Sequence, residues 1–331
     1  MFFDASGETL FYLRRVDGRE TLFAHQPDHP RGDYHAALEV SHGRLMAWPC
    51  GRHAVLVCDG WPRADDRGLS FKLLETSRVK SLLAKQPRQV NELLTDVPKL
   101  SEFSVEHRAL PPRVFDILKG DSASVAGFAP SDDGTGSAPA IYAIDGKAAT
   151  FRLVHLPFLE RTTIPAAVYA APDGKHHWLT VTDSNHLFVL DERYAIVGDV
   201  LWPSEQQGLA RLAFDPARGE VWVSVQGSLL IFNTKTFKLT GEIAAAPELR
   251  WHRGERVRGF LGGVCLDSSG TRAWLARPLA GDVVEYDART RKQIGTWPMT
   301  VDPLELTIAP ANSRVYVQGL RSGAISWFPS P

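Results

Sequence analysis

The sequence has little cysteine, with three among 331 residues. Cys50 and Cys58 are close in the chain, but a turn at 51–53 sets Cys58 opposite Met46, so we expect no disulfide between them. Cys265 lies in an apolar run, which predicts a small buried side chain. A chain of this length buries roughly three quarters of its unfolded surface. Folding therefore requires neither a disulfide nor a structural metal.

Neither sign of charge dominates, and no long apolar run is present. Lys and Arg number 37 and Asp and Glu 38, so the net charge of −1 gives no general attraction to nucleic acid or to an acidic membrane. No window approaches the roughly 18 apolar residues of a membrane helix. The first residues lack the basic and apolar parts of a secretory signal. We expect a cytoplasmic protein, with a periplasmic location left open if a leader has been removed.

Linear motifs of catalysis are missing as well. The sequence contains no His-Glu-x-x-His, Gly-x-Ser-x-Gly or Cys-x-x-Cys, no phosphate-binding loop and no dinucleotide fingerprint. The enzyme classes that these motifs define are excluded. An enzyme that gathers its residues from several separate loops is not.

One histidine-rich segment contains residue types that bind divalent metals. Its members are His25, Asp28, His29, Asp33 and His35. Prolines at 27 and 30 interrupt the segment, and no helical spacing aligns its side chains. We interpret it as a polar surface loop, and we predict neither a metal nor a cofactor.

The sequence is rich in short runs of Val, Ile, Leu, Phe, Tyr and Trp between clusters of Gly, Pro and Asp, which is typical of β-strands. The clearest unit has four antiparallel strands, at 209–216, 220–225, 228–233 and 237–243. Further copies occur at 167–199, 261–297 and 304–328, and weaker ones at 2–40, 45–83 and 125–163. The copy at 304–328 ends after its third strand.

A turn residue follows the first strand of each copy. These residues are Gly7, Gly51, Gly134, Gly174, Gly219, Gly270 and Asn312, separated by 40 to 51 residues except for one gap of 83. Repeats of this kind predict an all-β fold, a seven-bladed β-propeller of four-stranded antiparallel blades that forms one domain over 1–331. The wide gap holds an insertion at 87–119 or a degenerate eighth blade. We favour the insertion, because 90–94 is typical of a short helical turn and three prolines break the remainder.

Large aromatic residues recur at one place in the second strand of the clearest copies: Trp178, Trp222, Trp274 and Tyr316. The space between neighbouring blades widens outward, so bulky side chains are needed there. We expect these four residues to be buried between blades rather than to stack on a ligand.

The repeats resemble a known family in two places. The segments 314–319 and 220–236 are similar to the Tyr-Val-Thr-Asn class of propeller repeats. That class resembles in turn the large subunits of quinoprotein amine dehydrogenases and the lactonase-type propellers. The resemblance implies the fold and leaves the function open, because one fold serves many functions.

A basic segment lies in the connection between two blades, an extended loop at 247–259. Its candidate ligand-binding or partner-binding residues are Arg250, Trp251, His252, Arg253, Arg256 and Arg258. Arginine beside an aromatic residue suits a carboxylate, a phosphate or an acidic protein surface. The alternative is a solvated basic loop. Other inter-blade positions at the propeller mouth are His42, Arg44, Arg211, Asp302 and Glu305.

These observations favour a non-catalytic binding scaffold that holds a protein partner or an anionic ligand at the propeller mouth. We expect neither nucleic acid nor a membrane as partner. One alternative is a lactonase-like hydrolase, in which His42, Arg211, Arg258, Asp302 and Glu305 would have to converge on one spot. Another is the propeller subunit of an oxidoreductase complex whose cofactor lies on a different chain.

Overall fold

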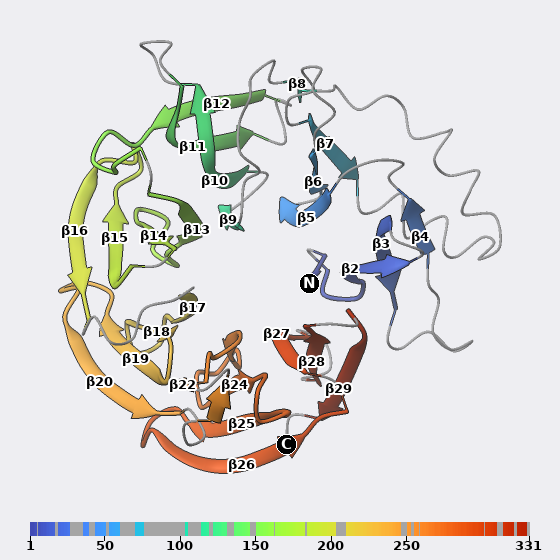
Figure 1. Cartoon of the computed structure of the whole chain (residues 1–331), viewed down its shortest axis with the longest axis vertical. Coiled ribbons are helices and arrows are strands. Elements are labelled where there is room, and N and C mark those ends of the chain that lie inside the picture. The colour runs from blue at the N-terminus through green and yellow to red at the C-terminus, as the bar shows by residue number, and fades with distance from the viewer. Residues whose placement is uncertain are drawn as a thin grey trace. The chain divides into compact units, whose positions relative to one another are not determined.

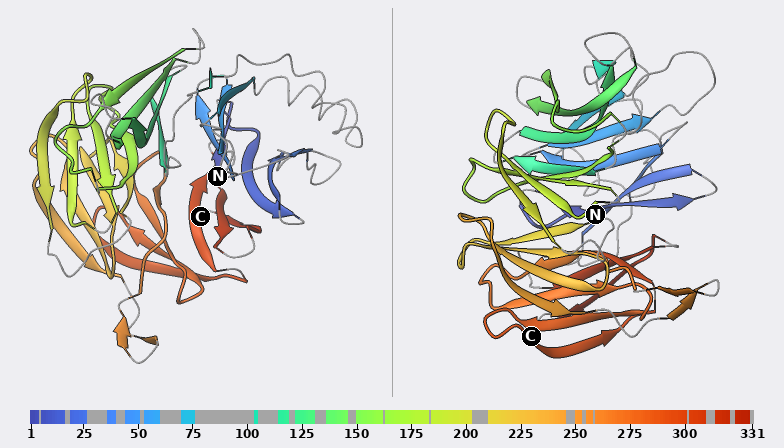
Figure 2. Two further views of the ribbon diagram at one scale, coloured as in Figure 1. Left: turned by 45° about the horizontal axis from the view of Figure 1, so that its top comes forward. Right: turned by 60° about the vertical axis from the view of Figure 1, so that its left-hand side comes forward.

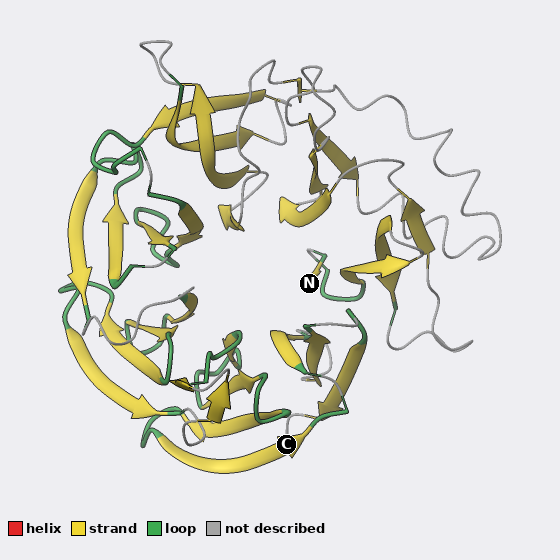
Figure 3. Ribbon diagram, viewed as in Figure 1, coloured by secondary structure: helices red, strands yellow, loops and turns green. Residues whose placement is uncertain are grey.

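The computed structural model describes residues 1–4, 6–16, 19–26, 36–39, 44–50, 53–59, 70–75, 103–104, 114–118, 122–130, 136–145, 150–161, 163–182, 184–202, 210–245, 250–252, 255–257, 259–300, 302–309, 314–320 and 323–329. These residues form strands, turns and loops and contain no helix (Figure 3). Within them, therefore, no helix is long and apolar enough to cross a membrane. The predicted all-β class is confirmed.

The chain divides into two compact units, Met1–Val168 and Tyr169–Pro331. The first unit contains three four-stranded antiparallel sheets, in the orders β1-β2-β3-β4, β5-β6-β7-β8 and β12-β11-β10-β9. Their strands are β1 (Phe2–Phe3), β2 (Leu10–Val16), β3 (Arg19–His25), β4 (Ala36–Glu39), β5 (Arg44–Cys50), β6 (His53–Asp59), β7 (Ser70–Glu75), β8 (Phe103–Ser104), β9 (Val114–Leu118), β10 (Ser122–Pro130), β11 (Ser137–Asp145) and β12 (Thr150–His155).

The second unit contains the remaining sheets, and β13 crosses the boundary between the two units. Three are four-stranded (β13–β16, β17–β20 and β23–β26), β27–β29 has three strands, and β21–β22 is a two-stranded hairpin. The bounds are β13 (Pro165–Ala170), β14 (His177–Val181), β15 (His186–Leu190), β16 (Ile196–Leu201), β17 (Arg211–Asp215), β18 (Glu220–Ser224), β19 (Ser228–Asn233), β20 (Leu239–Ala244), β21 (Arg250–His252), β22 (Glu255–Val257), β23 (Val264–Leu266), β24 (Arg272–Arg277), β25 (Asp282–Asp287), β26 (Lys292–Pro298), β27 (Pro303–Ile308), β28 (Arg314–Gly319) and β29 (Ile325–Pro329).

Consecutive sheets of the second unit follow one another in chain order. Within this unit, the fourth strands β16, β20 and β26 lie along one side, and the first strands β17 and β27 lie on the other (Figure 1). The sheets coincide with the copies predicted at 167–199, 209–243, 261–297 and 304–328. The number of blades and the single domain stay predictions.

The predicted insertion at 87–119 is too long, because parts of it belong to the sheets. Phe103–Ser104 is β8, which pairs with β7, and Val114–Leu118 is β9, which pairs with β10. The stretch at 125–130 is therefore part of a second strand, not the first strand of its copy. The helical turn predicted at 90–94 lies outside the described residues. The predicted register near Cys58 was also wrong by one residue, because Cys58 pairs with Leu45.

The predicted turn glycines that the structure describes share one conformation. Gly7, Gly174, Gly219 and Gly270 have φ between 63° and 71°. Glycine adopts this left-handed region without the steric cost that a Cβ imposes. The same short turn can therefore join the first two strands of each of these sheets.

The large aromatic residues of the second strands are buried, and the three tryptophans among them lie between neighbouring sheets, as predicted. Trp178, Trp222, Trp274 and Tyr316 have no exposed surface. Each indole shares a hydrophobic cluster with residues from the second strand of the following sheet: Trp178 with Val221 and Val223, Trp222 with Ala273 and Leu275, and Trp274 with Val315 and Val317. Burial of a large aromatic side chain thus joins each of these sheets to the next.

We expect Trp222→Ala to lower the free energy of unfolding by about 3–5 kcal/mol, because a fully buried indole leaves a cavity between two sheets. Trp327 is the matched control, since its side chain is 52% exposed and carries Arg314 over its ring. Trp327→Ala should cost about 0.5–1 kcal/mol. Urea unfolding measures both changes, and equal losses would contradict the inter-sheet role of Trp222.

Candidate functional site

Each sheet of the second unit has two distinct edges. We call the edge where the first strand begins the connection edge, because the chain arrives there from the preceding sheet. The opposite edge, where the first strand turns into the second, is the turn edge. The antiparallel register sets Arg211 opposite Ser224 at the connection edge, and Asp215 opposite Glu220 at the turn edge.

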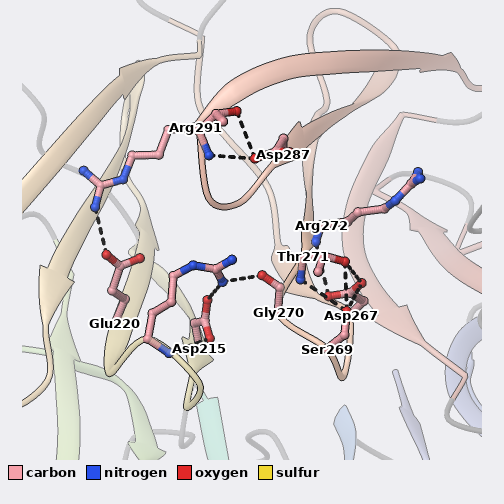
Figure 4. A network of polar contacts seen from close by, with 11 residues as sticks. Asp215, Glu220, Asp267, Ser269, Gly270, Thr271, Arg272, Asp287 and Arg291 are labelled. Atoms are coloured by element: carbon pink, nitrogen blue, oxygen red, sulfur yellow. Dashed lines mark hydrogen bonds and ion pairs between the residues drawn. The ribbon is translucent and has the colours of Figure 1, made fainter.

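The turn edge carries a network of buried charges (Figure 4). Arg218 forms an ion pair with Asp215, whose side chain is fully buried, and donates a hydrogen bond to the carbonyl oxygen of Gly270 in the next sheet. Arg291 reaches back from the β25–β26 turn to the Glu220 carboxylate at 2.8 Å and to the Thr240 carbonyl oxygen at 2.7 Å. Two arginines therefore join sheets β17–β20 and β23–β26. This network stabilises the contact between the two sheets.

The connection edge brings two predicted site residues into contact. Arg211, the first residue of β17, forms an ion pair with Glu305 of β27. Their side chains are 20% and 36% exposed. Burial would lower the pKa of Arg211, but the electrostatic effects of Glu305 and Tyr169, together with the hydrogen bond to Glu305, outweigh burial and raise this pKa above its ordinary value. Asp302 lies just before β27, where its carbonyl oxygen accepts a hydrogen bond from the Leu320 amide.

A second ion pair at the connection edge holds the basic connection at its start. Arg277 donates two hydrogen bonds of 2.7 Å to the Asp282 carboxylate and a longer one of 3.4 Å to the carbonyl oxygen of Ala245. At the other end of the connection, the Gly262 carbonyl oxygen accepts a hydrogen bond of 2.7 Å from Ser224. Both ends of the connection are therefore fixed to the sheets.

The basic connection is a hairpin, whereas the sequence predicted an extended loop at 247–259. Strands β21 and β22 pair with each other, with Trp251 opposite Arg256 and His252 opposite Glu255. In both views of Figure 2 the hairpin extends away from the sheets of the second unit. The sheet that β21 and β22 form contains no third strand among the described residues.

The remaining predicted residues are not brought to this site by the described structure. Arg253, Arg258 and His42 lie outside the described residues. Arg44 begins β5 in the first unit. Of the five residues that a hydrolase would require, the structure brings Arg211 and Glu305 together.

Sequence reasoning missed the Arg277–Asp282 pair and the Arg218–Asp215 pair. Arg277 and Asp282 are directly opposed across the β24–β25 turn, so hairpin register was the signal that could have found them. Among the described residues, no group of three or more His, Cys, Asp or Glu side chains is placed to hold a metal.

Comparison with known proteins shows the fold. No protein-family model matches the sequence, and no curated protein does. Among solved structures, the β-propeller domain of Cps50 (Swd1) from Myceliophteria thermophila is similar with a TM-score of 0.68 at 15% identity, covering 100% of this chain and 95% of that one. Hydrazine synthase from Kuenenia stuttgartiensis is similar with a TM-score of 0.69 at 14% identity, covering 99% and 94%.

The chain has the β-propeller fold. At these identities the similarity establishes architecture alone, because a propeller can serve many unrelated functions. The sheets of the second unit are therefore propeller blades. Function has to be argued from the residues at their edges.

We expect Arg218→Ala to lower the free energy of unfolding by about 3–5 kcal/mol, because it leaves the Asp215 carboxylate buried without its cation. Arg289→Ala is the control: Arg289 is exposed in a turn, and its loss should change stability by less than about 0.5 kcal/mol. Chemical denaturation at neutral pH compares the two variants. If they unfold at the same midpoint, the turn-edge network does not stabilise the sheets.

Proposed function

We propose that the protein is a non-catalytic binding protein whose propeller presents hairpin β21–β22 to an acidic surface on a protein partner. One observation carries this proposal. Four arginines against one glutamate lie in the nine residues 250–258. The described strands of this segment, β21 and β22, pair with no other strand among the described residues and extend from the second unit. A concentration of charges of one sign on a projecting element is suited to recognition.

The connection supports this role through its fixed ends. Hydrogen bonds at Ala245 and Gly262 hold both ends of the connection against the sheets, close to the hairpin. A fixed base lowers the entropy that an element loses when it docks. The sheets then act as a rigid support, and the hairpin supplies the chemical recognition.

Arginine chemistry sets the expected partner. A guanidinium offers a planar set of donors that matches a carboxylate, and an aromatic neighbour such as Trp251 adds apolar contact area. The net charge of the chain is −1, so the positive potential of the hairpin is local. An acidic patch would be attracted to this element in a salt-dependent way.

The finer assignments belong to the same proposal. We infer a Tyr-Val-Thr-Asn-type propeller of seven blades, a cytoplasmic location, and binding that requires neither a cofactor nor nucleic acid. A lactonase-like hydrolase is the alternative that the Arg211–Glu305 contact favours in part. Because the Arg211 guanidinium and the Glu305 carboxylate neutralise each other in that contact, the pair suits binding better than hydrolysis.

Capture experiments with hairpin variants test the proposal. From a lysate of the source organism, Arg250→Ala/Arg256→Ala should capture at most about one tenth of the partner that the wild-type chain captures. The reason is that each charge-assisted contact is worth about 1.5–3 kcal/mol. The melting temperature should not change, because the hairpin forms a sheet of its own.

The control removes the same two charges elsewhere. Arg193 and Arg289 lie exposed in turns of the second unit, so Arg193→Ala/Arg289→Ala should bind like the wild type. Raising the salt concentration should release the partner from the wild type and the control alike. The proposal fails if the hairpin variant captures the same protein in the same amount as the control.

A further inference from the structure

Arg211 differs in its contacts from the other four arginines that form ion pairs in the described part of the second unit. Arg218, Arg277 and Arg291 each donate to a main-chain carbonyl oxygen as well as to a carboxylate. Arg272 pairs with Glu285, whose carboxylate is buried and also accepts from Trp297. These four arginines are therefore held at more than one point or by a buried partner.

The Arg211 guanidinium makes one hydrogen bond to the described residues. Its Nη1 donates to Glu305 Oε1, and the described residues provide no other hydrogen bond to either side chain. Glu305, at 36% exposure, is the most exposed of the five carboxylates in these pairs. At this exposure the Glu305 carboxylate can rotate into water when it leaves Arg211.

The position of the pair also suits a ligand. β17 and β27 are first strands. Arg211 is the first residue of β17 and Glu305 the third residue of β27, so both lie toward the connection edge. The Arg211 side chain is 20% exposed, so an anion could reach it while much of the guanidinium is shielded from water. Partial burial strengthens the attraction between opposite charges, and this applies to Glu305 as well as to an incoming anion.

We propose that Arg211 is the binding group of a site for a small anion carrying a carboxylate or phosphate group, and that Glu305 is an internal competitor which the ligand displaces. The guanidinium fork suits either group, since both present two oxygens in one plane. The ligand would replace the single contact from Glu305 with a bidentate one. This site concerns a small ligand and is independent of partner binding by the hairpin.

Calorimetric titration of the full chain with sodium citrate and with inorganic phosphate, at constant ionic strength, tests this site. Glu305→Gln removes the competing charge and nearly preserves the side-chain volume, so it should bind at least one of the two anions about tenfold more tightly than the wild type. Arg211→Gln should abolish this binding, also in the Glu305→Gln background. Tighter binding of citrate would identify a carboxylate ligand, and tighter binding of phosphate a phosphorylated one.

Two further variants separate binding from stability. Asp282→Asn removes the charge that pairs with Arg277, an arginine at the same edge that donates two hydrogen bonds to Asp282. This variant should leave anion affinity unchanged. Arg211→Lys keeps the charge without the fork, so combined with Glu305→Gln it should bind more weakly than Glu305→Gln alone. This comparison remains available if Arg211→Gln does not fold.

Two results would overturn the site. One is that Glu305→Gln binds neither anion more tightly than the wild type. The other is that its gain survives the loss of Arg211 or appears equally in Asp282→Asn. Arg250→Ala/Arg256→Ala should leave anion affinity at the wild-type value, so failure of this site and failure of the hairpin proposal give different results.

Discussion

The second unit depends on one recurring contact, the burial of a second-strand indole against the second strand of the next sheet. Trp178, Trp222 and Trp274 make this contact in succession, and none has exposed surface. The contact contributes to the spacing of sheets whose described strands pair only within their own sheet. These aromatic side chains therefore help to position the sheet edges that carry the candidate sites.

The arginines at the two edges of these sheets differ in how they are bonded. At the turn edge, Arg218 and Arg291 are bonded to carboxylates and to main-chain carbonyl oxygens, which commits their charges to holding sheets together. At the connection edge, Arg211 has one partner, and the basic hairpin extends from a connection with fixed ends. Both proposals therefore place binding at the connection edge.

Much of the fold was predictable from the sequence, because strands with a period of two and left-handed turn glycines are local signals. Gly174, Gly219 and Gly270 and the four second-strand aromatics were assigned correctly for this reason. The limits of the insertion at 87–119 were not, because β8 and β9 are short and are defined by the strands they pair with. The hairpin escaped prediction because Arg250 to Arg258 shows basic composition more strongly than strand alternation.

The sequence predicted the positions of the candidate site residues in the chain, but it did not predict which of these residues contact each other. Arg211 and Glu305 were expected at inter-blade connections, but they are 94 residues apart in the chain. Their meeting depends on how sheets β17–β20, β23–β26 and β27–β29 are arranged, which no local pattern specifies. The same holds for Arg218, whose second partner is the Gly270 carbonyl oxygen of a neighbouring sheet.

Native mass spectrometry of the chain, isolated at low salt from its own source, tests the central claim most directly. The account predicts a stoichiometric complex with a second protein of acidic composition, which dissociates as the salt concentration rises and does not form with Arg250→Ala/Arg256→Ala. A bare chain at low salt, or a complex that the hairpin variant retains, would contradict the account.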